Sequence, residues 1–150
     1  MVCAFTGHRP QRLPWGSRED DPRCLALKQR LDESIAQAAA RGCDTFLCGM
    51  ARGCDTYFAE AVLKHGLRLE AVVPCPEQAD RWPPADRERY RKLLLRSFCI
   101  SLGFIVNAFI GRLAALQPVL PSPPIPVRLY ITLPNLPRIS AEGRRCLAIL

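Results

Sequence analysis

The sequence predicts a doubly wound α/β fold, in which a mostly parallel sheet carries helices on both faces. Three observations support this prediction. The 150 residues suit one domain with a real core, and 49% of them are apolar, as in globular proteins. In addition, strand-like and helix-like segments alternate three times over the first 97 residues. Such alternation is typical of parallel strands joined by right-handed crossover helices.

The first strand, helix and second strand follow from patterns near the N-terminus. The apolar run 2–7 (VCAFTG) predicts a buried strand, and the charged, proline-containing segment 8–21 predicts a long loop. An N-cap and first-turn signal stands at residues 21–22. Apolar residues then recur at spacings of three and four up to Gly42, which predicts an amphipathic helix of about five turns with a glycine cap. Residues 44–48 (DTFLC) predict the second strand.

The alternation continues with two more helices and a third strand. Residues 49–55 (GMARGCD) form the connection after the second strand, and residues 56–66 (TYFAEAVLKHG) predict the second helix, with Asp55 as its N-cap. Residues 67–74 (LRLEAVVP) predict a third strand that ends at a proline. Residues 84–96 (PADRERYRKLLLR) predict the third helix.

The composition changes after the third helix. Residues 1–97 hold 29 charged side chains, of which 13 are acidic, whereas residues 98–150 hold six, of which one is acidic, together with half of the 14 prolines. The chain therefore divides into the N-terminal part of an α/β domain and an apolar, proline-rich tail. Strand-like patterns persist in the tail at 98–106 and 127–133. The sheet is nevertheless expected to be incomplete at its C-terminal end.

The formal net charge of +7 indicates an anionic partner, which could be a nucleotide, a nucleic acid or a membrane surface. The apolar stretch 98–116 falls short of a membrane span because Asn107 and Arg112 interrupt it, so no membrane partner is expected. Eight cysteines follow no C-x-x-C spacing, and no secretory signal precedes them. We therefore expect reduced, mostly structural thiols in a cytoplasmic protein, with no metal site and no cofactor.

Two loops are expected at the same edge of the sheet, because ligands of parallel α/β sheets bind beyond the carboxyl ends of the strands. The first loop follows the strand at 2–7, and the second is GMARGCD, residues 49–55. Glycines let the backbone approach a ligand, and the N-terminus of the following helix offers free N–H groups and a positive dipole end. Arg52 adds a donor suited to phosphate or carboxylate. The pattern predicts an anion site, although a tight turn beside a solvated arginine would look the same.

Other polar residues near these loops allow more than one interpretation. His8 is a candidate general base because of its imidazole side chain, but loop histidines more often form hydrogen bonds at the surface. Glu60 is expected to form a surface ion pair with Lys64, four residues further along the helix. Trp82 is expected to pack beside a turn, with stacking on a base as the alternative. The second loop is neither a Walker A nor a G-x-G-x-x-G loop.

Three segments together resemble a known group of proteins. CAFTGHRPQRLPWG (3–16), CGMARGCDTYFAEAVL (48–63) and PCPEQADRWPPADRERYRKLL (74–94) are similar to the YpsA-like branch of the SLOG superfamily, and the resemblance covers roughly residues 1–97. The superfamily also includes the DNA-processing protein A and the Lonely Guy phosphoribohydrolases. The resemblance implies a Rossmann-like domain that binds a nucleotide or a nucleotide derivative. The ligand-binding positions that it implies are Thr6, Gly7, His8, Arg9, Gly49, Met50, Ala51, Arg52, Gly53 and Asp55.

The resemblance leaves three functions open. A sensing or regulatory nucleotide-binding module is the main expectation. The second is a phosphoribohydrolase-like hydrolase, for which Asp55 and Glu60 are the nearest carboxylates; the P-G-G-x-G-T-x-x-E motif of those enzymes is absent, which weighs against hydrolysis. The third is single-stranded DNA binding, because GMARGCD is also similar to a loop of the DNA-processing protein A. The family's second glycine-rich loop is missing from the tail, 98–150, which suggests that a frameshift replaced the family's second half.

Overall fold

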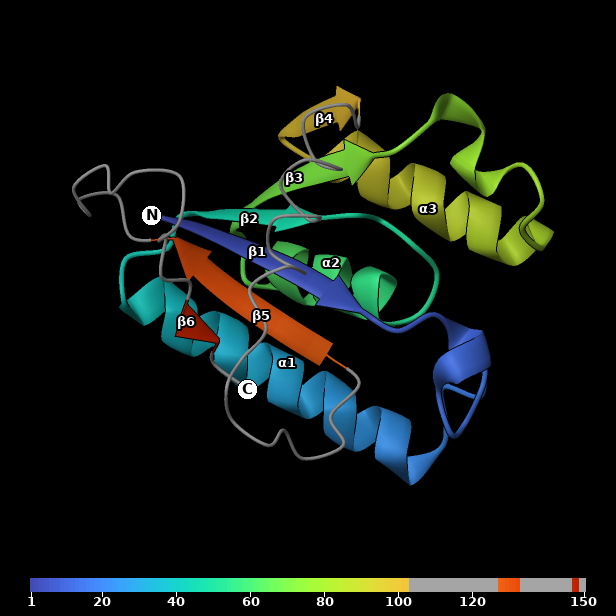
Figure 1. The fold of residues 1–150 in the computed structure, drawn as a ribbon, viewed down its shortest axis with the longest axis horizontal. Helices are drawn as coiled ribbons and strands as arrows, with labels where there is room; N and C mark the ends of the chain where they lie inside the picture. The colour runs from blue at the N-terminus through green and yellow to red at the C-terminus, as the bar shows by residue number, and fades with distance from the viewer. Residues whose placement is uncertain (103–126, 133–146, 149–150) are drawn as a thin grey trace, which may run out of the picture.

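The sheet confirms the predicted α/β class, since its first four strands run parallel (Figure 1). The computed structural model describes residues 1–102, 127–132 and 147–148. Across the sheet the strand order is β4-β3-β2-β1-β5-β6, and the pairs β1–β5 and β5–β6 are antiparallel. The strands are β1 (Val2–Gly7), β2 (Thr45–Cys48), β3 (Arg68–Val73), β4 (Cys99–Leu102), β5 (Val127–Thr132) and β6 (Leu147–Ala148).

Three α-helices connect the parallel strands close to the predicted positions. They are α1 (Pro22–Ala40), α2 (Cys54–Lys64) and α3 (Pro84–Arg96), with 3₁₀ turns η1 (Pro10–Arg12) and η2 (Pro76–Ala79) in the loops. The carboxylate of Asp21 accepts a hydrogen bond from the Arg23 N–H and so caps α1, as predicted. Both α1 and α2 end in a glycine with positive φ, Gly42 and Gly66, followed by the paired backbone hydrogen bonds of a Schellman motif.

The three helices lie on one face of the sheet. Strands β1 to β4 stand in chain order, so three right-handed crossovers place every helix on the same side. The contacts of α2 with both α1 and α3 agree with this arrangement, and Figure 1 shows the sheet in front of the helices. The sequence predicted helices on both faces of the sheet. Among the described residues, all three α-helices lie on one face, because the strand order does not reverse between β1 and β4.

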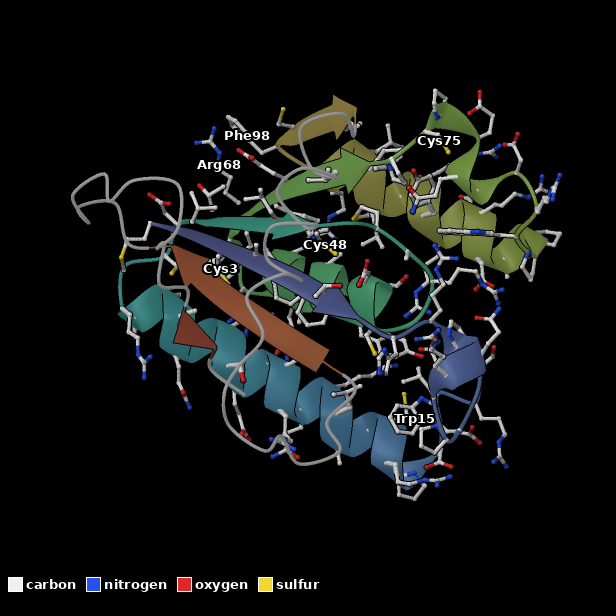
Figure 2. The ribbon with its side chains drawn as sticks, in the orientation of Figure 1. Cys3, Trp15, Cys48, Arg68, Cys75 and Phe98 are labelled. Carbon is white, nitrogen blue, oxygen red and sulfur yellow. The ribbon has the colours of Figure 1, made fainter. Side chains whose placement is uncertain are left out.

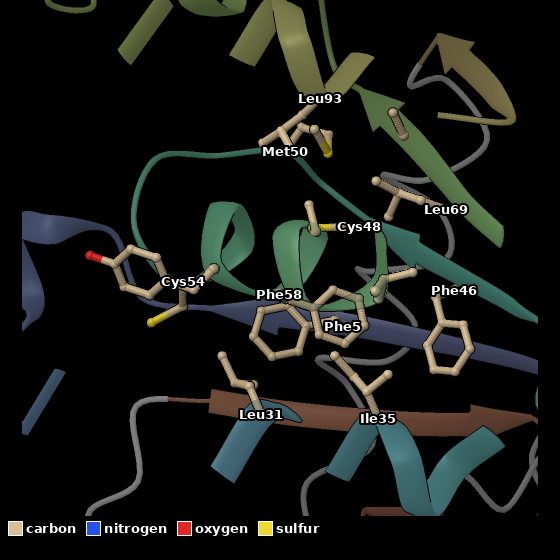
Figure 3. Packing of buried hydrophobic residues seen from close by; sticks show 14 of the residues in the cluster. Phe5, Leu31, Ile35, Phe46, Cys48, Met50, Cys54, Phe58, Leu69 and Leu93 are labelled. Carbon is tan, nitrogen blue, oxygen red and sulfur yellow. The ribbon is translucent and has the colours of Figure 1, made fainter. Parts of the chain in front are cut away.

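The core between the helices and the sheet fixes the ends of β1 and β2. Phe5 of β1 and Cys48 of β2 are paired in register, and both are buried on the helical face. The ring of Phe5 stacks on that of Phe58 of α2, with centroids 4.2 Å apart, and Phe46 lies against the same ring (Figure 3). Burying a side chain of this size contributes about 2–3 kcal/mol. The packing therefore holds the starts of both predicted ligand-binding loops against α2.

The segment after α3 forms the predicted fourth strand, β4, at the edge of the sheet. The Phe98 N–H donates to the Leu69 carbonyl, and the Arg68 guanidinium lies 3.3 Å from the centre of the Phe98 ring (Figure 2). Strand β5 confirms the pattern noted at 127–133. The remainder of the tail lies outside the described residues, so the expected loss of the family's second glycine-rich loop and the frameshift both stay predictions.

The cysteines agree with the expectation of structural thiols. All seven that are described are free, and five of them are buried, including Cys3 and Cys48 on the helical face of the sheet (Figure 2). Burial raises the pKa of the Cys3 thiol to about 12, which keeps it protonated and unreactive. Within the described part of the chain, no helix has both the length and the apolar character needed to cross a membrane.

Candidate anion-binding site

The two predicted loops lie side by side beyond the carboxyl ends of β1 and β2. We call residues 6–9 the first loop and residues 49–53 the second loop. Their strands are hydrogen-bonded neighbours, with Val2 to Phe5 opposite Thr45 to Cys48. Both loops also meet the N-terminus of α2, as the sequence predicted. The structure thus brings all ten predicted positions into one region.

Asp55 joins the two loops. It is 6% exposed, and its two carboxylate oxygens accept hydrogen bonds from the backbone N–H of Gly7 at 3.2 Å and of Ala51 at 3.1 Å. The prediction that Asp55 caps α2 is wrong, because the N-cap residue is Gly53 and Asp55 is already inside the first turn. Its carboxylate satisfies donors in both loops and so sets their relative position.

The environment of Asp55 also changes its acidity. Burial, which disfavours the charged form, raises the pKa of Asp55 to about 6. The hydrogen bonds from Ala51 and Gly7 and the positive charge of Arg9 oppose this shift without cancelling it. At neutral pH the group is therefore mostly ionised and able to accept both hydrogen bonds.

The backbones of the two loops touch at Gly53. The Cys54 N–H donates to the His8 carbonyl at 3.2 Å. A Cβ built on Gly53 would lie 2.8 Å from that carbonyl oxygen and 3.0 Å from the Pro10 ring, and Gly53 has a φ of 90°. No side chain fits there without a shift of the backbone. We refer to this contact, together with the Asp55 hydrogen bonds, as the loop junction.

The second loop contains one further unusual residue. Met50 is buried and has a φ of 57°, a left-handed backbone conformation that residues other than glycine, asparagine and aspartate rarely adopt. Its side chain lies near Leu93 of α3 (Figure 3). The Gly49 carbonyl beside it accepts a hydrogen bond from the Gln78 amide at 3.1 Å. Packing and hydrogen bonding thus hold the strained loop in place, as a residue in a rarely populated conformation requires.

The first loop presents its polar side chains to solvent. His8 and Arg9 are exposed, and Thr6 is half-buried at the end of β1. Trp15, further along the same segment, is 6% exposed and anchors it in the core (Figure 2). The loop thus combines a fixed backbone with accessible donors, which suits a ligand that arrives from solvent.

A hollow of about 40 Å³ adjoins the loop junction. It lies between the second loop, the start of α2 and the first turns of α3, and its walls include Arg52, Gly53, Tyr57, Trp82, Asp86 and Arg89. A cavity needs roughly 10–15 Å³ to hold one water molecule. The hollow therefore has room for a few waters or for one oxyanion group, but not for a whole nucleotide.

Arg52, which the sequence predicts to donate hydrogen bonds to a bound anion, forms an ion pair within the protein. Its Nη2 lies 2.6 Å from Oδ2 of Asp86 on α3, and the two side chains are 23% and 30% exposed. Its Nε is buried and has no hydrogen-bond partner among the described residues. The arginine is thus only partly satisfied by its carboxylate.

Arg89, the second arginine of the hollow, is bound more completely. Its Nη2 lies 2.6 Å from Glu60 and 3.2 Å from Glu19, and further nitrogens reach the same two carboxylates. The hydrogen bonds that Arg89 donates to Glu60 and Glu19 raise the pKa of Arg89 above its usual value. The predicted pair between Glu60 and Lys64 is wrong: Glu60 binds Arg89, and Lys64 binds Asp32 of α1.

Aromatic rings support these charges. Trp82 packs edge-on against Tyr90, with centroids 5.2 Å apart, which confirms the predicted packing role, and it also lines the hollow. Tyr57 is buried, and two cations lie near its ring: Lys28 at 4.7 Å and Arg89 at 5.7 Å from the ring centre. These contacts keep the start of α3 against the start of α2.

The sequence did not single out the acidic side of the hollow. Glu19 lies in the long segment before α1, and Asp86 and Arg89 lie on α3, more than 30 residues after the second loop in the chain. The only signal was that PADRERY stands in one of the segments that carry the resemblance, and nothing in it tells which charges face inward. In the described part of the chain, no group of three or more His, Cys, Asp or Glu residues has a geometry that would hold a metal ion.

Four parallel strands with helices between them, and two glycine-containing loops that meet at a helix N-terminus, define a Rossmann-like domain. A family model described as the YspA SLOG family (YpsA) matches residues 3–101. The chain belongs to this family, and membership suggests a nucleotide-related function. No curated protein matches the chain.

Proposed function

We propose that this protein is a sensing or regulatory module that binds a nucleotide or a nucleotide derivative through its first two loops. One observation carries the proposal: Asp55 fixes two glycine-containing loops beside the N-terminus of α2. Exposed His8 and Arg9 stand next to this arrangement. Oriented N–H groups, a positive helix end and accessible cationic donors suit a phosphate group. The free, mostly buried thiols suit a cytoplasmic location.

The two carboxylates named for a hydrolase are both engaged. Asp55 is buried and hydrogen-bonded through both oxygens, and Glu60 is bound to Arg89. A general acid or base must exchange a proton with the substrate, and the oxygens of both groups already accept hydrogen bonds within the protein. A binding role therefore fits the geometry better than hydrolysis of a glycosidic bond.

Single-stranded DNA binding remains the rival, since the net charge is +7 and Arg9 is exposed. The two functions differ in their response to salt. Affinity for DNA falls steeply with salt because several phosphates release counterions together. A single small nucleotide that sits at a loop junction should show a much shallower dependence.

The test is calorimetric titration of the full chain with AMP and ADP, with adenosine and an oligothymidylate as comparisons. We expect AMP or ADP to bind, adenosine to bind more weakly, and Arg9→Ala to weaken binding about tenfold through loss of a charge-assisted hydrogen bond. Arg91→Ala is the matched control, because Arg91 is exposed on α3 and has the same charge. Absence of AMP and ADP binding by a cooperatively folded chain would rule the proposal out, and a steep salt dependence with tighter oligothymidylate binding would favour the rival.

A further inference from the structure

The two arginines of the hollow differ in how fully they are bound. Arg89 contacts two carboxylates, those of Glu19 and Glu60, through several nitrogens. Arg52 contacts one carboxylate, that of Asp86, and leaves its buried Nε without a partner among the described residues. A guanidinium can donate five hydrogen bonds in a fixed fork. Arg52, which lines the hollow, therefore has one carboxylate partner where Arg89 has two, and its guanidinium is the less fully paired of the two.

The hollow is large enough for one oxyanion group that could accept hydrogen bonds from Arg52. Its volume is about 40 Å³, and it lies beside Gly53 and Thr56 at the N-terminus of α2. Gly53 brings the backbone of the loop junction to the edge of this space. A helix end of this kind favours negative charge, and a planar guanidinium fits phosphate or carboxylate oxygens in pairs.

We infer that this hollow receives the anionic group of the ligand. In the absence of ligand, the Asp86 carboxylate pairs with the Arg52 guanidinium, and the ligand displaces it from this ion pair. The inference rests on the proposed nucleotide-binding function and adds a built-in competitor to it. Asp86 stands where an oxygen pair of a phosphate would stand, 2.6 Å from the guanidinium. The protein thus binds its own anion in the empty state, and affinity for the ligand is lowered by the strength of that contact.

Asp86 can release Arg52 at modest cost. It lies in the first turn of α3, where a carboxylate is stabilised by the helix dipole whether or not it is paired with an arginine. Arg52, for its part, lies in a loop rather than inside a helix. Exchange of one anion for another at Arg52 therefore needs no break in the core, which the burial of Tyr90 and Leu93 on the same helix maintains.

The test measures binding of inorganic phosphate and of AMP to the full chain and to Asp86→Asn. This variant keeps the size of the side chain and removes its charge. We expect both probes to bind about tenfold more tightly to the variant, which corresponds to about 1.4 kcal/mol. Asp32→Asn is the matched control, because Asp32 also pairs with a cation but on α1, away from the hollow. It should leave both affinities unchanged.

A double variant shows whether the effect passes through Arg52. Arg52→Ala should abolish phosphate binding, and Asp86→Asn added to it should restore nothing, since the two residues act on one contact. If Asp86→Asn prevents folding, Asp86→Ser provides the second variant, because a serine also accepts hydrogen bonds in a first helical turn.

The outcomes separate this inference from the proposed function. If the wild type binds AMP and Asp86→Asn binds it equally well or more weakly, the competitor role of Asp86 is overturned, whereas the nucleotide site remains in place. A folded wild type and a folded Asp86→Asn that both fail to bind phosphate and AMP overturn the proposed function itself. Tighter binding by Asp86→Asn and by Asp32→Asn alike would reveal a general charge effect and would also overturn the inference.

Discussion

At the loop junction, backbone atoms and one buried carboxylate hold the site together, whereas across the hollow, on α3, paired surface side chains do so. The junction depends on close approach: the Gly53 backbone meets the His8 carbonyl, and Asp55 accepts two N–H groups. The α3 side depends on ion pairs between side chains that are roughly a quarter to two-fifths exposed. Residues of both regions line the same hollow.

The difference separates rigidity from exchange. A steric contact between backbones has one arrangement, and a change there must shift the loops themselves. A half-exposed ion pair is screened by solvent and can be replaced by another pair at small cost. We therefore expect the junction to determine whether the site exists, and the α3 side to determine how readily an anion enters it.

The largest expected effect tests the junction. Gly53→Ala places a Cβ 2.8 Å from the His8 carbonyl at a φ of 90°, so strain and collision add. We expect a loss of stability of about 3 kcal/mol, measured by urea unfolding. Gly66→Ala is the matched control, because Gly66 also has positive φ but nothing within 4 Å, and it should cost about 1 kcal/mol. Equal losses for both variants would show that close approach at Gly53 is unimportant.

The next effect tests the carboxylate of the junction. Asparagine in place of Asp55 offers one acceptor oxygen for two backbone donors, so Asp55→Asn should lose about 2 kcal/mol at pH 7. The pKa of about 6, above the unfolded value, means that the folded state binds more protons between pH 6 and 4. The contribution of Asp55 to stability should therefore rise as the pH falls through this window, by up to about 1 kcal/mol per pH unit.

Denaturant unfolding between pH 7.5 and 4.5 measures this slope. The variant should lack the contribution that wild type shows, because an amide does not titrate. The other described carboxyl groups with shifted pKa values, such as Glu19 and Asp32, have lowered ones, so they lose their stabilisation only at lower pH. Identical pH dependence in wild type and variant would contradict the assignment of a raised pKa to Asp55.

The same division explains what the sequence could predict. Strand and helix positions follow from local periodicity and from turn residues such as Pro22, Gly42 and Gly66, so the first four strands and three helices appear where expected. The convergence of the two loops follows from parallel topology alone. The glycines of GMARGCD indicated close approach after a buried strand, and the backbone at Gly53 does approach the His8 carbonyl closely; the ligand-binding role of the loop stays a prediction.

What the sequence could not give is the pairing of charges across elements. Glu60 has Lys64 one turn away, and local spacing favours that pair, yet Arg89 from α3 binds it instead. Likewise Asp55 has the residue type of an N-cap, but its carboxylate turns back to serve two loops. Such choices depend on distances between segments far apart in the chain. The prediction of helices on both faces of the sheet was wrong for the same reason, because the order of the strands in the sheet is not local information either.

The smallest expected effect tests the α3 side. Arg89→Lys keeps the charge but replaces a fork of donors by one compact ammonium, which cannot hold Glu19 and Glu60 in the same geometry. Since these carboxylates are about a third exposed, we expect a loss of only about 1 kcal/mol in urea unfolding.

Salt distinguishes this loss from a packing defect. Because the Debye length falls to about 3 Å at 1 M salt, the difference between Arg89→Lys and wild type should shrink as salt is added. Arg91→Lys, an exposed arginine on the same helix, should change stability at neither salt concentration. The loss in Gly53→Ala should be unchanged by salt, since steric collision does not depend on screening. A loss in Arg89→Lys that persisted at high salt would mean that Arg89 supports Tyr57 by packing, and that the α3 side is as rigid as the loop junction.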